Sequence, residues 1–170
     1  AVTDAAGAYR FEGLPTYEYR LHFRDLSQNF APYSPPSVFV ESGAAPVVVD
    51  ANLAPGAFIS GQLRRRDGSL ATAGYVSAYN FAETGALVSY DTTSGADGSY
   101  RLRGLAAGSY HVCARIDGFH TCYGDIAPEH PPMVGTILRL VAVVAGEEAT
   151  GINISLEPPR YTFLPAIQRE

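Results

Sequence analysis

The feature that most constrains the fold of this chain is an internal repeat. The stretch GAYRFEGLPTYEYRL begins at Gly7, and GSYRLRGLAAGSYHV begins at Gly98; the two align without a gap. A motif that returns after an interval the size of a small domain indicates two copies of one structural unit. The repeat therefore predicts a tandem organisation whose first copy lies close to the start of the chain.

Apolar and polar residues alternate inside both copies. In residues 17–24, two tyrosines, a leucine and a phenylalanine alternate with charged residues and a histidine. A period of two is typical of an antiparallel strand with one face in the core and one in water. In the second copy we expect the inward residues to be Tyr110, Val112 and Ala114, and the outward ones to be His111, Cys113 and Arg115.

Seven further stretches have the composition of strands and are separated by Gly, Pro or Asp-Gly turn signals. They are residues 57–63, 74–80, 86–93, 100–104, 119–124, 137–144 and 151–156. The Asp-Gly turns are expected at Asp67-Gly68, Asp97-Gly98 and Asp117-Gly118, and no amphipathic helix is evident. Short strands with turns about every ten residues predict an all-β fold of tandem antiparallel β-sandwiches.

The repeat also divides the chain. Residues 56–158 can hold one complete sandwich, from GAFISGQL to GINISLEP. Residues 1–55 hold only the C-terminal half of such a unit, which comprises the GAYRFEGL turn, the strand at 17–24 and a closing strand at 46–55. We therefore expect the first sandwich to be incomplete. Residues 159–170 form a β-prone tail, which follows the second closing strand as residues 57–63 follow the first.

The sequence of the complete unit resembles a known family. GAFISGQLRRRDGS, the following GYVSAYN, DGSYRLRGLAAGSYHV and the closing GINISL are similar to the prealbumin-like (transthyretin-like) β-sandwich repeats of bacterial surface proteins, which include carboxypeptidase regulatory-like and Cna B-type domains. The resemblance covers nearly all of residues 56–157 and the half-unit before them. It implies a sandwich used as a stalk, a spacer, a pilus subunit or a sugar-binding accessory.

The basic residues depart from one branch of that family. All 12 basic residues are arginines, and the chain contains no lysine. Some Cna B-type domains lock their strands with an isopeptide bond from a lysine, and sortase-built pili are linked through a lysine. Neither linkage is therefore expected here, and the end FLPAIQRE lacks the Thr-Gly of a sortase signal.

Cys113 and Cys122 are the only cysteines. They lie on either side of Asp117-Gly118, a strong signal for a two-residue hairpin, and so can face each other across adjacent strands. A disulfide closing a loop of about ten residues would contribute roughly 2.5 to 3 kcal/mol in the chain-entropy interpretation. The alternative is two free thiols in a reducing compartment; the disulfide indicates an extracellular or cell-surface location.

No group of residues predicts catalysis, a cofactor or a dedicated metal site. No serine lies in a Gly-x-Ser-x-Gly elbow. Asp91, Asp97 and Asp125 can contribute to a Ca²⁺ site built on loops, although they lack the regular spacing of a dedicated calcium loop. The histidines also lack the spacing of metal ligands. The residues considered for these roles are His22, His111, His120, His130, Asp91, Asp97 and Asp125.

Two surface features leave alternatives open. Tyr75, Tyr79, Tyr90 and Tyr123 can form a stacking platform for sugar rings or can pack in and across the sheets. The arginines at 64–66 suit a solvated strand edge or an anion contact.

The net charge of -5, without a basic stripe, gives no indication of nucleic-acid binding. The longest apolar stretch is interrupted by charged residues and predicts no membrane insertion.

These observations favour a non-catalytic structural module of a cell-surface stalk or filament. A half-sandwich at residues 1–55 would leave an open apolar face, to be completed by preceding chain, by adjacent repeats or by another copy through β-strand addition. A tail that fills this gap in the next subunit would build a head-to-tail filament. Pro165 restricts such a strand to an edge or bulge. The alternative is a carbohydrate-binding or adhesive accessory module of a secreted protein. The candidate donor residues are Tyr161, Phe163, Leu164 and Ile167.

Overall fold

The structure is a computed structural model that describes residues 1–65, 67–81, 87–124 and 139–156. These residues form strands and no helix, which confirms the all-β prediction, so this part of the chain also offers no helix able to cross a membrane. The strands are β1 (Tyr17–Tyr19), β2 (Val38–Val40), β3 (Ala57–Arg65), β4 (Tyr75–Phe81), β5 (Leu87–Thr93), β6 (Ser99–Leu105), β7 (Gly108–Ile116), β8 (Phe119–Cys122), β9 (Val141–Val143), β10 (Glu148–Ala149) and β11 (Ile154–Leu156).

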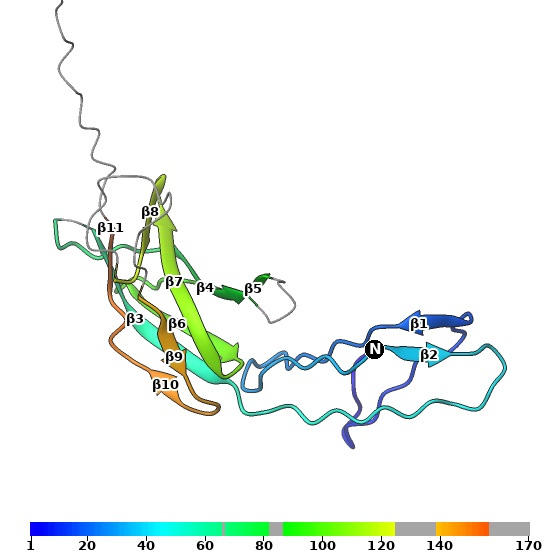
Figure 1. Cartoon of the computed structure of the whole chain (residues 1–170). Helices are drawn as coiled ribbons and strands as arrows, with labels where there is room; N and C mark the ends of the chain where they lie inside the picture. Colours follow the sequence, from blue (N-terminus) through cyan, green and yellow to red (C-terminus); the bar gives the residue numbers. More distant parts are fainter. Residues whose placement is uncertain (66, 82–86, 125–138, 157–170) are drawn as a thin grey trace, which may run out of the picture.

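Two sheets of the second part pack on a shared core (Figure 1). In one sheet β3 is central: it pairs antiparallel with β6, and parallel with β10 and β11. The other sheet has the order β5-β4-β7-β8, with β9 pairing the start of β7. Ile59 and Leu102 from the first sheet are fully buried together with Val76 and Val112 from the second. The alternation of apolar residues therefore produces a two-layer sandwich with one continuous core.

Two Asp-Gly-Ser turns connect strands in the same way. The Asp67 carboxylate accepts bonds from the backbone N–H and the hydroxyl of Ser69, and Asp97 does the same with Ser99. These bonds lower the pKa of both carboxyls. The middle residue of the second turn, Gly98, has a φ of 69°, a backbone conformation that glycine adopts without a steric penalty.

The predicted hairpin between β7 and β8 is present. Ile116 pairs with Phe119, so only Asp117 and Gly118 lie in the loop. Their φ angles are 49° and 82°, and a two-residue loop with positive φ at both positions is the kind that matches the twist of the strands. Gly and Asp are the residue types that tolerate this geometry, which explains why the sequence signal was reliable.

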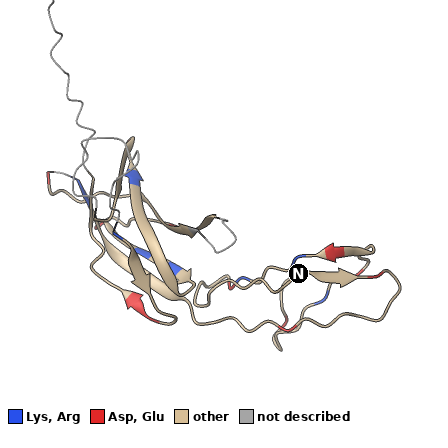
Figure 2. Ribbon diagram, in the orientation of Figure 1, with Lys and Arg blue, Asp and Glu red and all other residues tan. Residues whose placement is uncertain are grey.

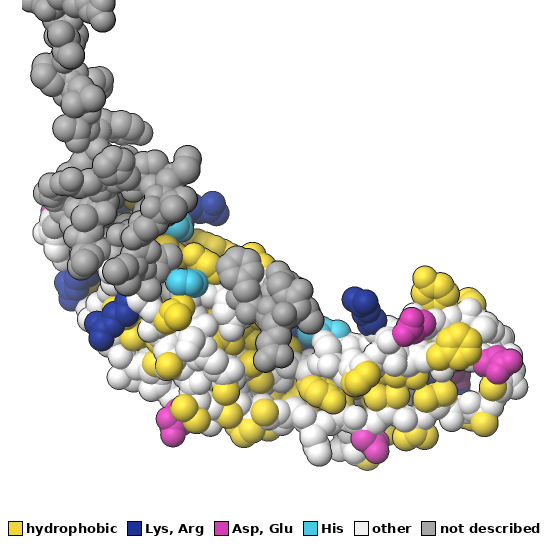
Figure 3. Space-filling model, viewed as in Figure 1, with side chains coloured by type: hydrophobic (Ala, Val, Ile, Leu, Met, Phe, Trp, Pro, Cys, Tyr) yellow, Lys and Arg dark blue, Asp and Glu magenta, His cyan; other side chains and the backbone are white. Residues whose placement is uncertain are grey.

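Residues 1–55 form an arm beside the sandwich (Figure 1). Only β1 and β2 pair as a ladder there, and Ala31 is the only buried residue of this part. Apolar side chains lie exposed along the arm in Figure 3. The exposed apolar residues of the arm include Leu26, Phe39 and Val48, with 79%, 64% and 80% of their surface exposed. The arm therefore has the strand pairing of a β-layer without a layer packed against it.

One loop joins the arm to the sandwich. The Asp25 carboxylate accepts bonds from the backbone N–H groups of Ser27, Asn29 and Phe30 and from the Ser27 hydroxyl. The side-chain bond from Ser27 is the largest of the causes that lower the pKa of Asp25. The ordered loop presents the Asn29 carbonyl to the N–H of Gly56, at 2.7 Å. This contact lies where the arm passes into β3.

Several strand predictions differ from the structure; the stretch 151–156, for example, is a strand only over β11. The stretch 17–24 is a strand only over β1, followed by an isolated bridge between Phe23 and Tyr33. The stretch 119–124 ends as a strand at Cys122, and residues 46–55 contain no strand. Residues 137 and 138 of the stretch 137–144 lie outside the described residues, and β9 covers its later part. The prediction for Cys113 also needs correction: it lies on the outer face of β7 but is buried, with 1% of its surface exposed.

Candidate functional site

The two copies of the repeated motif have the same backbone geometry at their first turn. The N–H of Gly7 donates to the Asp4 carbonyl, and the N–H of Gly98 donates to the Gly95 carbonyl, each at 3.0 Å. The two glycines have φ angles of 79° and 69°. The sequence repeat thus specifies a repeated turn, and every later residue of the motif has a counterpart in the other copy.

A tyrosine closes the second turn of each copy. The Tyr19 hydroxyl donates to the Pro15 carbonyl at 3.0 Å, and the Tyr110 hydroxyl donates to the Ala106 carbonyl at 2.9 Å. Gly13 and its counterpart Gly104 both have a φ of 68°. The same residue types therefore form the same corner twice, once exposed in the arm and once in the sandwich.

The single ladder of the arm has the register of a ladder in the sandwich. Tyr17 pairs with Val40 and Tyr19 with Val38. Their counterparts pair in the same order, because Gly108 pairs with Val143 and Tyr110 with Val141. The strands β1 and β2 are thus the counterparts of the start of β7 and of β9.

The closing segment of the arm also has a counterpart. The Tyr9 hydroxyl donates to the Val49 carbonyl at 2.7 Å, and the hydroxyl of Tyr100, the counterpart of Tyr9, donates to the Ile152 carbonyl. Residues 8–14 therefore correspond to β6, and residues 51–53 correspond to β11. In the sandwich these segments are strands, whereas in the arm neither of them is.

The difference between the two copies is the central strand. In the sandwich β6, β10 and β11 all pair with β3, whereas β9 pairs with β7. Residues 1–55, all of which the structure describes, contain no counterpart of β3. A strand is held by ladder bonds to its neighbour, so only β1 and β2, which bond to each other, form. This explains why the prediction of a strand at residues 46–55 is wrong.

Core positions of the sandwich are incompletely covered in the arm. Leu102 is fully buried, but its counterpart Phe11 has 49% of its surface exposed. Tyr110 is buried, whereas Tyr19 is only half-buried. The same half-burial is found at the counterparts of Leu105, Val141, Val143, Ile152, Ile154 and Leu156, which are Leu14, Val38, Val40, Val49, Ala51 and Leu53.

These residues define a strand-acceptor slot, by which we mean residues 8–14 and 45–53 together with the apolar side chains between them. The sequence predicts an incomplete first sandwich, but neither the location of the slot nor its register. The sequence feature that points to the slot is the tyrosine of the repeated Gly-Ala-Tyr and Gly-Ser-Tyr triplets. Its hydroxyl bond to the closing segment becomes visible only once the fold is known.

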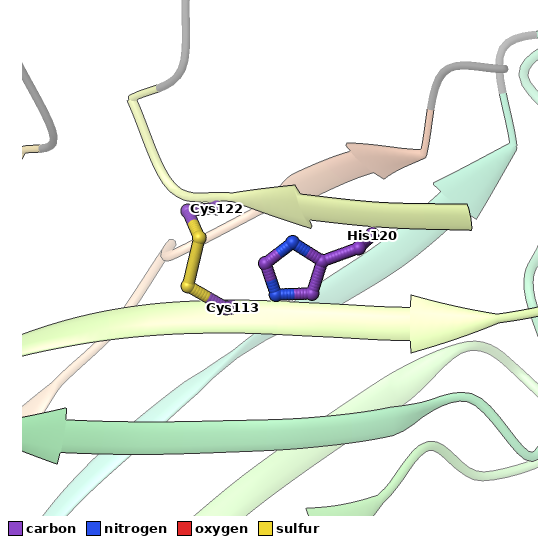
Figure 4. A group of neighbouring side chains, drawn as sticks. All are labelled: Cys113, His120 and Cys122. Carbon is purple, nitrogen blue, oxygen red and sulfur yellow. A yellow bond between two sulfur atoms is a disulfide. The ribbon is translucent and has the colours of Figure 1, made fainter. Parts of the chain in front are cut away.

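The predicted disulfide between Cys113 and Cys122 is present and links β7 to β8 (Figure 4). The His120 ring lies beside it, and the ligand atoms of these three residues lie within 4.8 Å of one another. Both sulfur atoms are bonded to each other and so cannot act as thiolate ligands. In the oxidised protein this group is a structural crosslink with a neighbouring exposed imidazole.

The four tyrosines considered as a sugar platform are divided between two environments. Tyr75 and Tyr79 lie on the outer face of β4, where Tyr75 is exposed and Tyr79 is half-buried against His111. Tyr90 packs edge-on against Tyr110, and Tyr123 packs against the core. They therefore do not form one continuous aromatic surface.

The remaining candidate residues form local contacts. His22 bonds to the Ser34 hydroxyl at 2.8 Å, and the Ser89 hydroxyl donates to Asp91 at 3.1 Å. Arg65 pairs with Asp117 at 3.3 Å. Charged residues are distributed along both parts of the described chain in Figure 2. Arg66, Asp125 and His130, and the donor-strand candidates Tyr161, Phe163, Leu164 and Ile167, lie outside the described residues.

Comparisons with known proteins give no identification, since no protein-family model matches the chain and no curated protein is significantly similar to it.

Proposed function

We propose that this chain is a non-catalytic structural module whose incomplete N-terminal β-layer is completed by a strand from another copy. The observation that supports the proposal is the strand-acceptor slot. It has the turns, tyrosine bonds and register of a sandwich half, but lacks the central strand that its counterpart holds. Open sheet edges and half-covered apolar residues are sites at which β-strands of other chains add.

The tail at residues 159–170 is the donor in this proposal. Slot and tail are different surfaces, so their contact is head-to-tail and propagates into a filament. Partners are thus other copies of the same chain or adjacent repeats. The contact needs no lysine chemistry, in keeping with a chain that has only arginines as basic residues.

The fold and location form part of the same proposal. The sandwich of β3 to β11 and the half-unit before it are interpreted as tandem prealbumin-like repeats of the carboxypeptidase regulatory-like or Cna B-type kind. Disulfides persist outside the cytoplasm, and the bond between Cys113 and Cys122 supports a place at the cell surface or outside the cell.

The mass of the full chain in solution tests the proposal. Light scattering coupled to size exclusion, over a range of concentrations, should show species larger than the 18.1 kDa monomer. Removal of residues 159–170 should return the protein to the monomer, because the donor is lost while the slot remains. A full chain that stays monomeric up to millimolar concentration would contradict the proposal.

A further inference from the structure

The way in which β3 fits its own sandwich shows what the strand-acceptor slot requires. Gly61 of β3 pairs with Tyr100, whose hydroxyl reaches across to the Ile152 carbonyl. A Cβ atom at Gly61 would lie 2.0 Å from that carbonyl oxygen. The central strand therefore needs a minimal side chain where the tyrosine bond crosses it. In the slot that bond joins Tyr9 and Val49, so the same restriction applies opposite Tyr9.

Two polar groups of the slot add to this requirement. Arg101 lies over the Phe58 ring at 4.1 Å, and its counterpart Arg10 is exposed in an ion pair with Glu12. The Asn153 side chain accepts a bond from the N–H of Gln62 of β3, at 2.9 Å. Its counterpart in the slot is Asp50, a carboxylate, which is a stronger acceptor for a strand N–H. The slot therefore favours an incoming strand that places an aromatic residue beneath Arg10, as Phe58 lies beneath Arg101.

Charge also favours a basic strand. Residues 1–55 carry six acidic and three basic residues. The segment that fills the equivalent place in the sandwich, residues 56–65, carries two arginines and no acid. The arm and residues 56–65 are therefore complementary in charge, which favours association, whereas residues 161–170 carry one arginine and one glutamate and are neutral.

The tail can be placed on this template from Thr162 onward, because Tyr161 would fall at the place of Gly56, where a Cβ atom would lie 2.7 Å from the Cα of Gly104. Its sequence YTFLPAIQRE aligns without a gap on GAFISGQLRR, the sequence of residues 56–65. This puts Phe163 at the place of Phe58 and Leu164 at the place of the buried Ile59. Ala166, the smallest side chain of residues 157–170, comes to the place of Gly61; because a Cβ atom there would lie 2.0 Å from the Ile152 carbonyl oxygen in the sandwich, the Val49 carbonyl of the slot has to move to admit it.

Pro165 is compatible with this register. It takes the place of Ser60, whose neighbours at alternate positions, Phe58 and Gln62, donate their N–H groups towards the Glu147 carbonyl and Asn153 rather than towards β6. Since N–H directions alternate along a strand, a proline at this place keeps the bonds to the counterpart of β6 and gives up one bond on the side of the counterparts of β10 and β11, so the inserted strand is held mainly as an edge strand beside residues 8–14.

We propose that the tail of a second copy inserts into the strand-acceptor slot in the register that places Ala166 opposite Tyr9. This inference rests on the proposed function and adds its register and its specificity. A glycine at position 166 fits better than alanine, because the crossing bond leaves almost no room, and a large side chain excludes the strand. Position 168, which takes the place of the buried Leu63, accepts a large apolar residue.

Three variants of the full chain test the register. Ala166→Leu and Gln168→Leu introduce the same side chain two residues apart on one strand face, so they serve as matched controls for each other. We expect Ala166→Leu to raise the protein concentration at which half of the chains are assembled, measured by light scattering, roughly tenfold or more. Gln168→Leu and Ala166→Gly should lower it. Equal effects of the two leucines, or assembly that is insensitive to all three changes, would overturn the register while leaving the proposed function standing.

A labelled peptide separates failure of the slot from failure of self-assembly. The peptide GAFISGQLRR, with the sequence of residues 56–65, is added to the dilute full chain, and binding is measured by fluorescence anisotropy. We expect binding, and at least tenfold weaker binding of the same peptide with leucine in place of its internal glycine. Binding with this preference by a chain that never assembles would uphold the slot and overturn the tail as donor. No binding, or no preference, would overturn the slot itself.

Discussion

Two tyrosines show how an identical residue contact can have a different energetic value. Tyr19 and Tyr110 each donate to the carbonyl four residues earlier. Tyr110 is nearly fully buried, whereas Tyr19 is half-buried. An unmade hydrogen bond costs free energy mainly where water cannot replace the lost partner. The contact is set by local sequence, but its contribution to stability depends on the layer that covers it.

Removal of the two hydroxyls should therefore have unequal effects. We expect Tyr110→Phe to lower the free energy of unfolding by about 1 to 2 kcal/mol, since it leaves the Ala106 carbonyl without its donor. The matched variant Tyr19→Phe should change it by less than about 0.5 kcal/mol in the monomer. Urea denaturation followed by circular dichroism provides the measurement, and equal losses for the two variants would contradict the argument.

Burial raises the pKa of Tyr100 and of Tyr110 well above the usual value of a tyrosine. A group whose pKa is raised by folding contributes stability below its unfolded pKa and loses it as the pH rises. We therefore expect the urea midpoint to be constant near pH 8 and to fall above about pH 10. Tyr110→Phe should make this decline shallower. A flat profile up to pH 11.5 would show that neither hydroxyl is protected by burial.

At the scale of the elements, the disulfide fastens β8 to β7. Cys113 and Cys122 are direct cross-strand partners and close a loop with a sequence separation of 9. Replacing both cysteines by alanine should lower the free energy of unfolding by about 2 to 3 kcal/mol, through greater freedom of the unfolded chain. Urea unfolding of this variant should match that of the native protein in dithiothreitol. An unchanged urea midpoint would contradict a stabilising role.

How far sequence predicts an element here depends on where its ladder partner lies. The β7–β8 hairpin was predictable because Asp117 and Gly118 fix its turn locally and its two strands pair with each other. The closing segment at residues 46–55 has the composition of a strand, yet stays unpaired because its partner would be a counterpart of β3. The location of the slot was likewise beyond sequence reasoning, since it depends on Tyr9 reaching Val49 across 40 positions.

At the scale of the whole molecule, the arm and the sandwich should differ in resistance to protease. Trypsin can cut this chain only after arginine, because lysine is absent. Arg10, Arg20 and Arg24 lie outside the ladders, whereas Arg101 and Arg115 lie within β6 and β7. We expect the arm to be cut first, as read by mass spectrometry over time, and its sites to be protected in assembled material. Simultaneous cleavage of both parts would contradict this order.

In the proposed assembly, the slot in the arm and the donor tail at residues 159–170 give the polymer a direction. One terminus of the fibre would always expose an empty slot, and the opposite terminus an unused strand. A soluble copy of the strand would cap the first terminus and would also fill the slots of free copies, so that growth would stop at both termini.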